Sequence, residues 1–466
     1  MNRLVAVLTS AGALVVLLAL STGAGAATQE AKSYLILAKG EKLPANVQAQ
    51  VAAAGGTLTN TIPQVGIAVA STTNADFKAK ASKIGSVVPN LEIDLVDPRR
   101  GIAGPSLSAL ANRPTSGDDD EFFDLQYGHD TVDAPEAWDA GERGDGVRVA
   151  VLDTGFDTDH PDLVPNVDFA ASRDFTGEGL TYSLPDPFSH GTHTAGTVAA
   201  ADNGLGTIGV APDATLVLVK MLGDDGTGDF EDGIEAIVYA AGAADANVVS
   251  MSWGVRVPRA GDPTDTDADT PEEVAELKRA LNLATRFANR QGATLLASTG
   301  NDGEDYDQNV EILSIPAMSD HVLAVSATTP IGWAVDPASN RSTNLASYSN
   351  YGNSIVDFSA PGGDLLYPGN ELCTVGPVTN FCFVFDLVFS TGSSLAPGQG
   401  AYFWSGGTSM AVPHVSGVAA IIIGAHGGSM NPRDVERMLK QSADDRIGRP
   451  KFFGHGQVNA GNAVAP

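Results

Sequence analysis

Beyond residue 124, short apolar runs alternate with longer segments whose apolar residues recur at helical spacing. Each apolar run has the length of a buried strand, and the runs read VRVAVLD, LVLVKML, NVVSMSW, TLLASTG and HVLAVSATT. The segment after Thr270 also carries a helix start signal, because Thr270 and Glu273 form a capping box and Pro271 occupies the first helical position. The alternation predicts an α/β fold with three layers, in which a mainly parallel sheet is covered by helices on both faces.

Residues 33 to 97 follow the pattern of a small separate module. Strand-like and helix-like pieces come in the order β-α-β-β-α-β, which predicts an α+β domain of ferredoxin-like arrangement within residues 27–98. The next stretch, residues 99–121, is rich in Gly, Pro, Ser and charge and lacks sustained periodicity, so we expect an exposed linker there. Residues 122–466 are then assigned to the large α/β domain.

The chain begins with a pattern typical of a secretion signal. Arg3 precedes a short apolar stretch from Ala11 to Leu20, and small residues end at Ala26. A membrane anchor is the alternative, but the stretch is short, and no second apolar span of about 18 residues follows in the sequence. We therefore expect residues 1–26 to be removed and the protein to be secreted to the extracellular space, with the periplasm or cell envelope as the alternative destination.

Two cysteines and a strong negative charge add to this picture. Export implies an oxidising environment, in which Cys373 and Cys382 are near enough in sequence to form a disulfide that closes one loop; a free buried pair is the alternative. The formal net charge of −29 disfavours nucleic acid and anionic membranes as partners, since both require basic patches. The acidity indicates solubility and some cation binding rather than a particular substrate.

Several polar residues lie where a parallel sheet collects its ligands, at the carboxyl ends of the strands. Asp153 ends the run VAVLD, His190 precedes a helix of small residues in SHGTHTAG, and Asn301 follows the run TLLAS. Ser409 lies in SGGTSMA, where glycines precede an apolar helix, so its hydroxyl is expected at a helix N-terminus. Taken singly, Asp153 and Ser409 are more simply explained as helix or turn caps.

Two interpretations join these residues into a site. His190 and His193 are three apart and could share a zinc ion, but neither an HExxH motif nor a nearby cysteine pair accompanies them. In the other interpretation, Asp153 orients His190, which acts as the general base for the nucleophile Ser409. A serine hydroxyl needs such a base, and the imidazole needs a carboxylate to hold its tautomer, so this interpretation predicts a catalytic triad.

The motifs DTGFDTDHPDL, HGTHTAG and GTSMA, in this order, resemble those of the subtilisin family of serine proteases. The resemblance extends from about Gln126 to the C-terminus, and the preceding module resembles the inhibitor-type propeptide of that family. It implies a subtilisin-like three-layer fold and four catalytic positions: Asp153, His190 and Ser409 as the triad, and Asn301 as a donor to the oxyanion. It also implies structural roles for His193 and His414.

The resemblance further implies a groove for an extended polypeptide substrate. In SMSWG, the backbone of Ser252 and Gly254 would bond the substrate, and Trp253 would line an apolar subsite, with a core position as the alternative. The pocket for the residue before the scissile bond is expected around Ser298, Gly300 and Ser314. The acidic loop DGEDYD that follows Asn301 would favour basic side chains there, unless it is an ordinary solvated loop.

Structural calcium is implied in the same way. Asp162 in HPDL matches a calcium ligand of the family, Asn203 lies in the equivalent of its calcium-binding loop, and Asp119 matches a ligand of members with an extended N-terminus. Carboxylate, amide and backbone oxygens suit Ca²⁺. No organic cofactor is expected.

These features predict a secreted, monomeric serine endopeptidase that is made as a preproprotein and processes itself. Its own propeptide would assist folding and then inhibit the cleft, with the mature N-terminus within residues 98 to 125. The alternatives are a catalytically inactive relative that only binds, a sedolisin-type acid peptidase, which HGTHTAG disfavours, and a dedicated maturation protease with one client. A long insertion, residues 361–405, would either wall the cleft or pack on the body.

Overall fold

The computed structural model describes residues 31–95, 99–107, 118–261, 270–337, 342–444 and 449–465. The predicted signal peptide, residues 1–26, lies outside the described residues. So does most of the second half of the predicted linker, residues 108–117.

The N-terminal domain has the predicted order of elements. Its antiparallel sheet has the strand order β2-β3-β1-β4, with β1 in the middle beside β3 and β4. The elements are β1 (Lys32–Ala38), α1 (Val47–Ala54), β2 (Thr57–Ile62), β3 (Ile67–Thr72), α2 (Phe77–Ala81) and β4 (Gly85–Pro89). The last strand predicted for this domain is two strands in the structure. The first is β4 in this sheet, and the second is β5 (Glu92–Asp94), which pairs with the large domain instead.

The large domain is built on the predicted, mostly parallel sheet. Its strand order is β16-β15-β13-β11-β7-β9-β8, and β17 also pairs with β15; among the described residues, the β15–β16 pair is antiparallel and the other pairs of this sheet are parallel. The strands are β7 (Arg148–Asp153), β8 (Arg173–Asp174), β9 (Thr215–Lys220), β11 (Val248–Met251), β13 (Thr294–Ser298), β15 (Val322–Thr329), β16 (Asn344–Leu345) and β17 (Phe358–Pro361).

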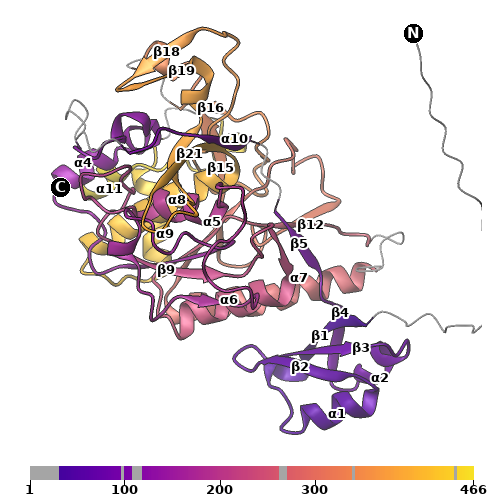
Figure 1. The fold of residues 1–466 in the computed structure, drawn as a ribbon. Helices are drawn as coiled ribbons and strands as arrows, with labels where there is room; N and C mark the ends of the chain where they lie inside the picture. The colour runs from indigo at the N-terminus through magenta and orange to yellow at the C-terminus, as the bar shows by residue number, and fades with distance from the viewer. Residues whose placement is uncertain are drawn as a thin grey trace, which may run out of the picture.

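Helices cover both faces of this sheet (Figure 1), which confirms the three layers. Side chains of β7 alternate between the two cores: Val149 and Val151 pack with α5 (His190–Ala199) and α8 (Thr408–Ala425), whereas Ala150 and Leu152 pack with α6 (Phe230–Gly242) and α7 (Pro271–Gln291). The capping box at the start of α7 is formed as predicted. The shorter helices are α3 (Tyr127–Thr131), α4 (Ala134–Asp139), α9 (Pro432–Ser442), α10 (Pro450–Phe453) and α11 (Ala460–Val464).

The sequence-based expectation that no second apolar span of about 18 residues follows was wrong, because helix α8, with 18 residues, is long and apolar enough to cross a membrane by composition alone. However, 89% of it is buried inside the protein, as expected for the core helix of a three-layer fold.

The N-terminal domain packs against α6 and α7 (Figure 1). One face of its sheet, including Leu35 and Val69, shares a hydrophobic cluster with these two helices. Polar contacts border this interface: Asn60 Nδ2 donates to Glu235 Oε2 over 2.6 Å, and Lys78 pairs with Glu273. The contact is therefore a packed interface with a polar rim.

The predicted linker is not irregular throughout, because residues Arg99–Ala103 form strand β6. This strand pairs with β21 (Ala401–Gly406), which also pairs with β20 (Val388–Gly392), so the three strands form a separate antiparallel sheet. The other two strands of this sheet, β20 and β21, come from the C-terminal part of the insertion of residues 361–405. The strand could not be predicted from local sequence, because its partner lies about 300 residues away in the chain.

The rest of the insertion divides between the body and a protruding hairpin. Ser390 Oγ in β20 donates to the His193 carbonyl of α5 over 3.0 Å, so the three-stranded sheet packs on the body. The hairpin of β18 (Leu372–Val375) and β19 (Val378–Phe381) projects outward in Figure 1. Cys373 and Cys382 close it with the predicted disulfide.

Candidate active site

Asp153 and His190 form a hydrogen-bonded pair at the carboxyl edge of the sheet. Asp153 is the last residue of β7 and His190 the first of α5, and Nδ1 of the imidazole lies 2.7 Å from Asp153 Oδ1. The carboxylate also accepts from the Thr194 hydroxyl at 3.0 Å and the Thr154 amide at 2.7 Å. Both partners are buried, at 1% and 5% exposure, so the pair is shielded from water and fixed in direction.

The start of α5 holds His190 close to the end of β7. Ser189 caps the helix, since its hydroxyl accepts from the Thr192 amide at 3.1 Å. Only glycine fits after His190: a Cβ on Gly191 would lie 2.8 Å from the Thr154 carbonyl oxygen. The small residues of HGTHTAG therefore allow the helix to approach the strand end.

Ser409 lies one residue inside the N-terminus of α8 and is 3% exposed. Its hydroxyl donates to the Ser252 carbonyl over 3.0 Å, and the Ser252 hydroxyl donates back to the Ser409 carbonyl over 2.8 Å. This reciprocal pair links the start of α8 to the residue after β11. The partial positive charge of the helix N-terminus lies at the same place and favours developing negative charge there.

Asn301 is held by the first residue of α8. Its Oδ1 accepts from the backbone amide of Thr408 at 2.9 Å and from the Thr408 hydroxyl at 2.8 Å. Because Oδ1 is the acceptor in both bonds, the amide Nδ2 is the group that can donate to a ligand. Gly300, with φ of 100°, supplies the left-handed backbone that turns the chain from β13 toward this position.

A cavity of about 300 Å³ adjoins Ser409 and Asn301. It is lined by all six residues that were predicted to bind substrate: Ser252, Trp253, Gly254, Ser298, Gly300 and Ser314. The indole of Trp253 is 1% exposed and packs in the core beside α6, so this residue combines the two roles that were weighed as alternatives.

Arg256 in β12 (Val255–Pro258) changes the charge of this cavity, and the sequence did not single it out. Its guanidinium bonds Asp302 at 2.7 Å and Glu304 at 2.6 Å. The acidic loop after Asn301 is therefore partly neutralised by a cation of the protein itself. This arrangement weakens the prediction that the loop attracts basic substrate side chains.

The chain's own N-terminal segment occupies the cleft. Strand β5 pairs antiparallel with β10 (Thr227–Asp229), and the Leu95 amide donates to the Gly226 carbonyl over 3.0 Å. Ile93 is fully buried in this contact, while Leu95 lines the cavity next to Ser409. Strand β6 of the same segment pairs with β21, and its first residue, Arg99, lies opposite Gly406, three residues before Ser409 in the chain.

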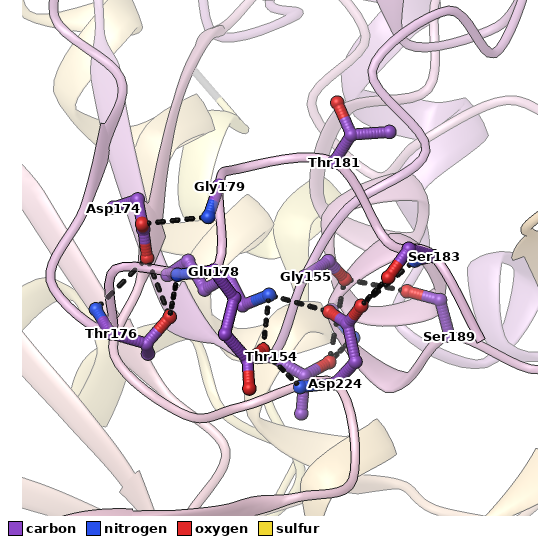
Figure 2. A network of polar contacts seen from close by, with 12 residues as sticks. Thr154, Gly155, Asp174, Thr176, Glu178, Gly179, Thr181, Ser183, Ser189 and Asp224 are labelled. Carbon is purple, nitrogen blue, oxygen red and sulfur yellow. Dashed lines mark hydrogen bonds and ion pairs between the residues drawn. The ribbon is translucent and has the colours of Figure 1, made fainter.

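A polar network supports the loop that follows Asp153 (Figure 2). The buried Lys220, which pairs in register with Asp153, bonds Asp224 at 2.6 Å and Glu178 at 2.9 Å. Asp224 also accepts from the amide and hydroxyl of Ser183, each at 2.8 Å. A lysine at the end of an apolar strand gives no sign of these partners, so sequence reasoning missed the network.

The two further histidines have the contacts of structural residues. His193 Nε2 lies 3.1 Å from the Phe403 carbonyl, and His414 Nδ1 lies 2.8 Å from the Met410 carbonyl. Burial lowers the pKa of His193 to about 3 and that of His414 to about 4. His190 bonds Asp153, and His193 bonds a backbone carbonyl. These contacts do not favour the zinc site that was considered for the two histidines.

Carboxylates gather instead where the large domain begins. Among the described residues, one group of possible metal ligands lies within 4.8 Å of one another: Asp118, Asp119, Asp120 and Asp202. Burial, together with the neighbouring Asp118, raises the pKa of Asp120 to about 9. Asp120 is fully buried and its Oδ2 has no hydrogen-bond partner among the described residues. A hard cation would fit this set of oxygens.

Of the three predicted calcium ligands, only Asp119 belongs to this group. Asp162 Oδ2 accepts from the Thr207 amide at 2.9 Å and the Tyr402 hydroxyl at 3.0 Å. The Asn203 side chain accepts from the Leu205 amide at 2.9 Å and donates to the Pro161 carbonyl over 3.3 Å, beside Asp162. The backbone amide of Asn203 donates to Asp120 Oδ1 over 3.4 Å. The insertion supplies Tyr402, which accounts for the different surroundings of Asp162.

Comparison with known proteins agrees with this geometry. The sequence pattern that defines the subtilase family matches residues 144–456. The chain belongs to the subtilase family. Among curated relatives of this subtilase, subtilisin BL of Lederbergia lenta is 34% identical over 338 residues, which is 72% of this chain and 97% of the relative. The subtilase is accordingly a serine endopeptidase of subtilisin-like fold.

Solved structures extend the similarity to most of the chain. An epidermin leader peptide processing serine protease from Staphylococcus aureus has a TM-score of 0.70 at 20% identity, covering 93% of this chain and 98% of its own. A lanthipeptide protease has a TM-score of 0.57 at 26% identity, covering 73% of this chain and 95% of its own. The first likeness shows the fold alone.

Proposed function

We propose that this subtilase is an exported endopeptidase that cleaves polypeptides through an acyl-enzyme on Ser409. The observation that supports it most is the buried 2.7 Å bond between Asp153 and His190 Nδ1. That bond holds the proton on Nδ1, which leaves Nε2 as the base. For this role the Ser409 hydroxyl would exchange its bond to the Ser252 carbonyl for a bond to Nε2.

The chemistry follows from these positions. As Ser409 Oγ attacks the scissile carbonyl, its proton passes to His190 Nε2, and Asp153 stabilises the imidazolium. Negative charge on the carbonyl oxygen is met by the Ser409 backbone amide and Asn301 Nδ2. The imidazolium then protonates the leaving amine, and water, activated by the same base, releases the acyl group.

Labelling with a fluorophosphonate probe at neutral pH tests this proposal, since only an activated serine reacts rapidly. We expect stoichiometric labelling of the wild type and none of Ser409→Ala. Ser416→Ala is the matched control, because Ser416 lies on the same helix and its hydroxyl bonds the Val412 carbonyl at 3.0 Å. Absence of labelling in folded, processed wild-type protein would favour the catalytically inactive alternative.

We also propose that the protein processes itself and that the segment before the cut is a propeptide. Strand β5 ends at Asp94, which lines the same cavity as Ser409, and β6 begins at Arg99, opposite Gly406. These positions support a first cut between Leu95 and Arg99, which is at or just before the start of the range of residues 98 to 125 expected from the sequence. The N-terminal domain would assist folding before this cut and remain in the cleft afterwards as a product-like inhibitor.

Mass spectrometry of secreted protein checks this processing. The wild type should yield a new N-terminus between residues 96 and 99, and Ser409→Ala should remain joined to its N-terminal domain. Mature Ser409→Ala protein from a protease-free preparation would contradict self-processing.

A dedicated maturation protease is the second candidate, and the 26% identity to a lanthipeptide protease favours it. Digestion of a diverse peptide library, read by mass spectrometry, separates the two. Cleavage of many unrelated sequences indicates a general endopeptidase, whereas cleavage restricted to one motif on both sides of the bond indicates a single client.

A further inference from the structure

The insertion presents a strand edge that leads directly to the nucleophile. Strand β21 ends at Gly406, three residues before Ser409, and only one of its edges is taken by β20. The other edge carries β6, with Arg99 opposite Gly406 and Ala103 opposite Phe403. The Gly104 amide continues the ladder, donating to the Tyr402 carbonyl over 2.7 Å. The segment thus begins beside Ser409 and runs away from it.

The side chains of β6 also fit a shaped surface. Ile102 packs against an aromatic cluster that includes Phe389 and Trp404. At Gly101 there is no room for a side chain, because a Cβ would lie 2.3 Å from the ring of Phe188, which is buried. Ala103 faces solvent. The edge of β21 therefore offers backbone hydrogen bonds along its length. It also offers an apolar contact to the residue at the position of Ile102 and leaves no room for a side chain at the position of Gly101.

We infer that this edge of β21 is a docking strand for the part of a polypeptide substrate that follows the scissile bond, and that β6 is its tethered occupant after the first cut. The inference rests on the proposed function. The partner it fits is an extended segment with a small residue where Gly101 lies and an apolar residue where Ile102 lies. In strand addition of this kind, backbone hydrogen bonds supply the affinity and the sites for side chains supply the selectivity.

Cutting the chain before Arg99 breaks none of the contacts between β6 and β21. The segment also remains attached, since it joins the large domain at Asp118, 14 positions beyond Gly104. A short tether gives an effective concentration on the order of 1 mM. A substrate at micromolar concentration that extends several residues beyond the scissile bond must therefore displace β6. A substrate with only a small leaving group after that bond need not displace it.

Two substitutions in the full-length chain separate these cases. Ile102→Asp places a charge against the aromatic cluster and should release β6, whereas Ala103→Asp places the same charge on the exposed face and should not. After processing, each protein is assayed with a chromogenic peptide anilide and with a quenched fluorescent peptide that has six residues after the scissile bond. We expect Ile102→Asp to lower KM for the long peptide about tenfold and to leave anilide hydrolysis unchanged. Equal KM values in all three proteins, with anilide hydrolysis intact, would overturn the inference.

Hydrogen exchange tests the docking without any catalysis. In uncut Ser409→Ala protein, the Gly104 amide should be protected; the protection should persist with Ala103→Asp and be lost with Ile102→Asp. Rapid exchange at Gly104 in the Ser409→Ala protein would refute the docking, whatever the activity. If no variant hydrolyses the anilide, the proposed function fails, and the substrate role of β21 fails with it, even where Gly104 is protected.

Discussion

At the scale of single residues, Asn301 has two separable tasks. Its Oδ1 anchors the start of α8 through Thr408, and its Nδ2 is proposed to bond the oxyanion. Asn301→Ala should lower kcat by about 100- to 1000-fold with little change in KM, the loss found for the corresponding donor in subtilisin, a member of the same family. Michaelis kinetics on a peptide anilide measure this effect.

Asn301→Asp is the informative companion, because it keeps an acceptor for Thr408 and removes the donor. We expect kcat to fall as far as in Asn301→Ala, while the melting temperature stays closer to that of the wild type. An Asn301→Asp enzyme with near-normal kcat would show that Asn301 acts through Thr408 rather than on the oxyanion.

At the scale of elements, Lys220 joins strand β9 to the two loops that carry Asp224 and Glu178. Lys220→Met removes a buried cation and leaves the Asp224 carboxylate with only the Ser183 donors, so the free energy of unfolding should fall by about 3 kcal/mol. Arg286→Met is the control, because it removes a half-exposed pair with Asp320 and should cost less than about 1 kcal/mol. Equal losses in the two variants, by denaturant titration, would contradict this account.

The buried histidines of the helices make stability depend on pH. Burial lowers the pKa of His414 on α8 to about 4, whereas the unfolded chain keeps the ordinary value near 6.5. Between these values only the unfolded chain binds the proton, so stability falls as the pH decreases from about 6.5 to 4. Measured by urea titration, His414→Asn should reduce this slope by up to about 1.4 kcal/mol per pH unit. An unchanged slope would contradict the assignment.

Local pattern was enough to predict much of this fold. The carboxyl ends of the strands in a parallel sheet lie at one edge. Asp153, His190 and Asn301 could therefore be placed at the same edge from their positions next to the apolar runs of the sequence. The Thr270–Glu273 capping box is also purely local, and it is formed. Interactions between distant segments could not be predicted. The pairing of β6 with β21 and the ion pair of Arg256 with Asp302 are examples, because the local sequence around one partner does not indicate the other.

At the scale of the whole molecule, the carboxylates of Asp118, Asp119 and Asp120 connect the start of the large domain to Asp202, in the loop that follows α5. We propose that Ca²⁺ binds this group and orders the segment once the N-terminal domain has been cut away. Without a cation, the raised pKa of Asp120, about 9, means that folding favours its protonated form. Stability in chelator should therefore decrease as the pH rises from about 4 toward 9, and Ca²⁺ should reverse the decrease.

Asp120→Asn tests this coupling, because the amide keeps the shape of the side chain but carries no charge. At pH 8 in chelator the variant should melt a few degrees above the wild type, since the amide, unlike the Asp120 carboxyl, does not have to take up a proton on folding. In millimolar Ca²⁺ the order should invert, because the variant has lost a charged ligand. Asp139→Asn, an exposed substitution in α4, should follow the wild type in both conditions. If Asp120→Asn still gained the full calcium-induced rise in melting temperature, the cation would have to bind elsewhere, and the start of the large domain would be held by the protein's own contacts alone.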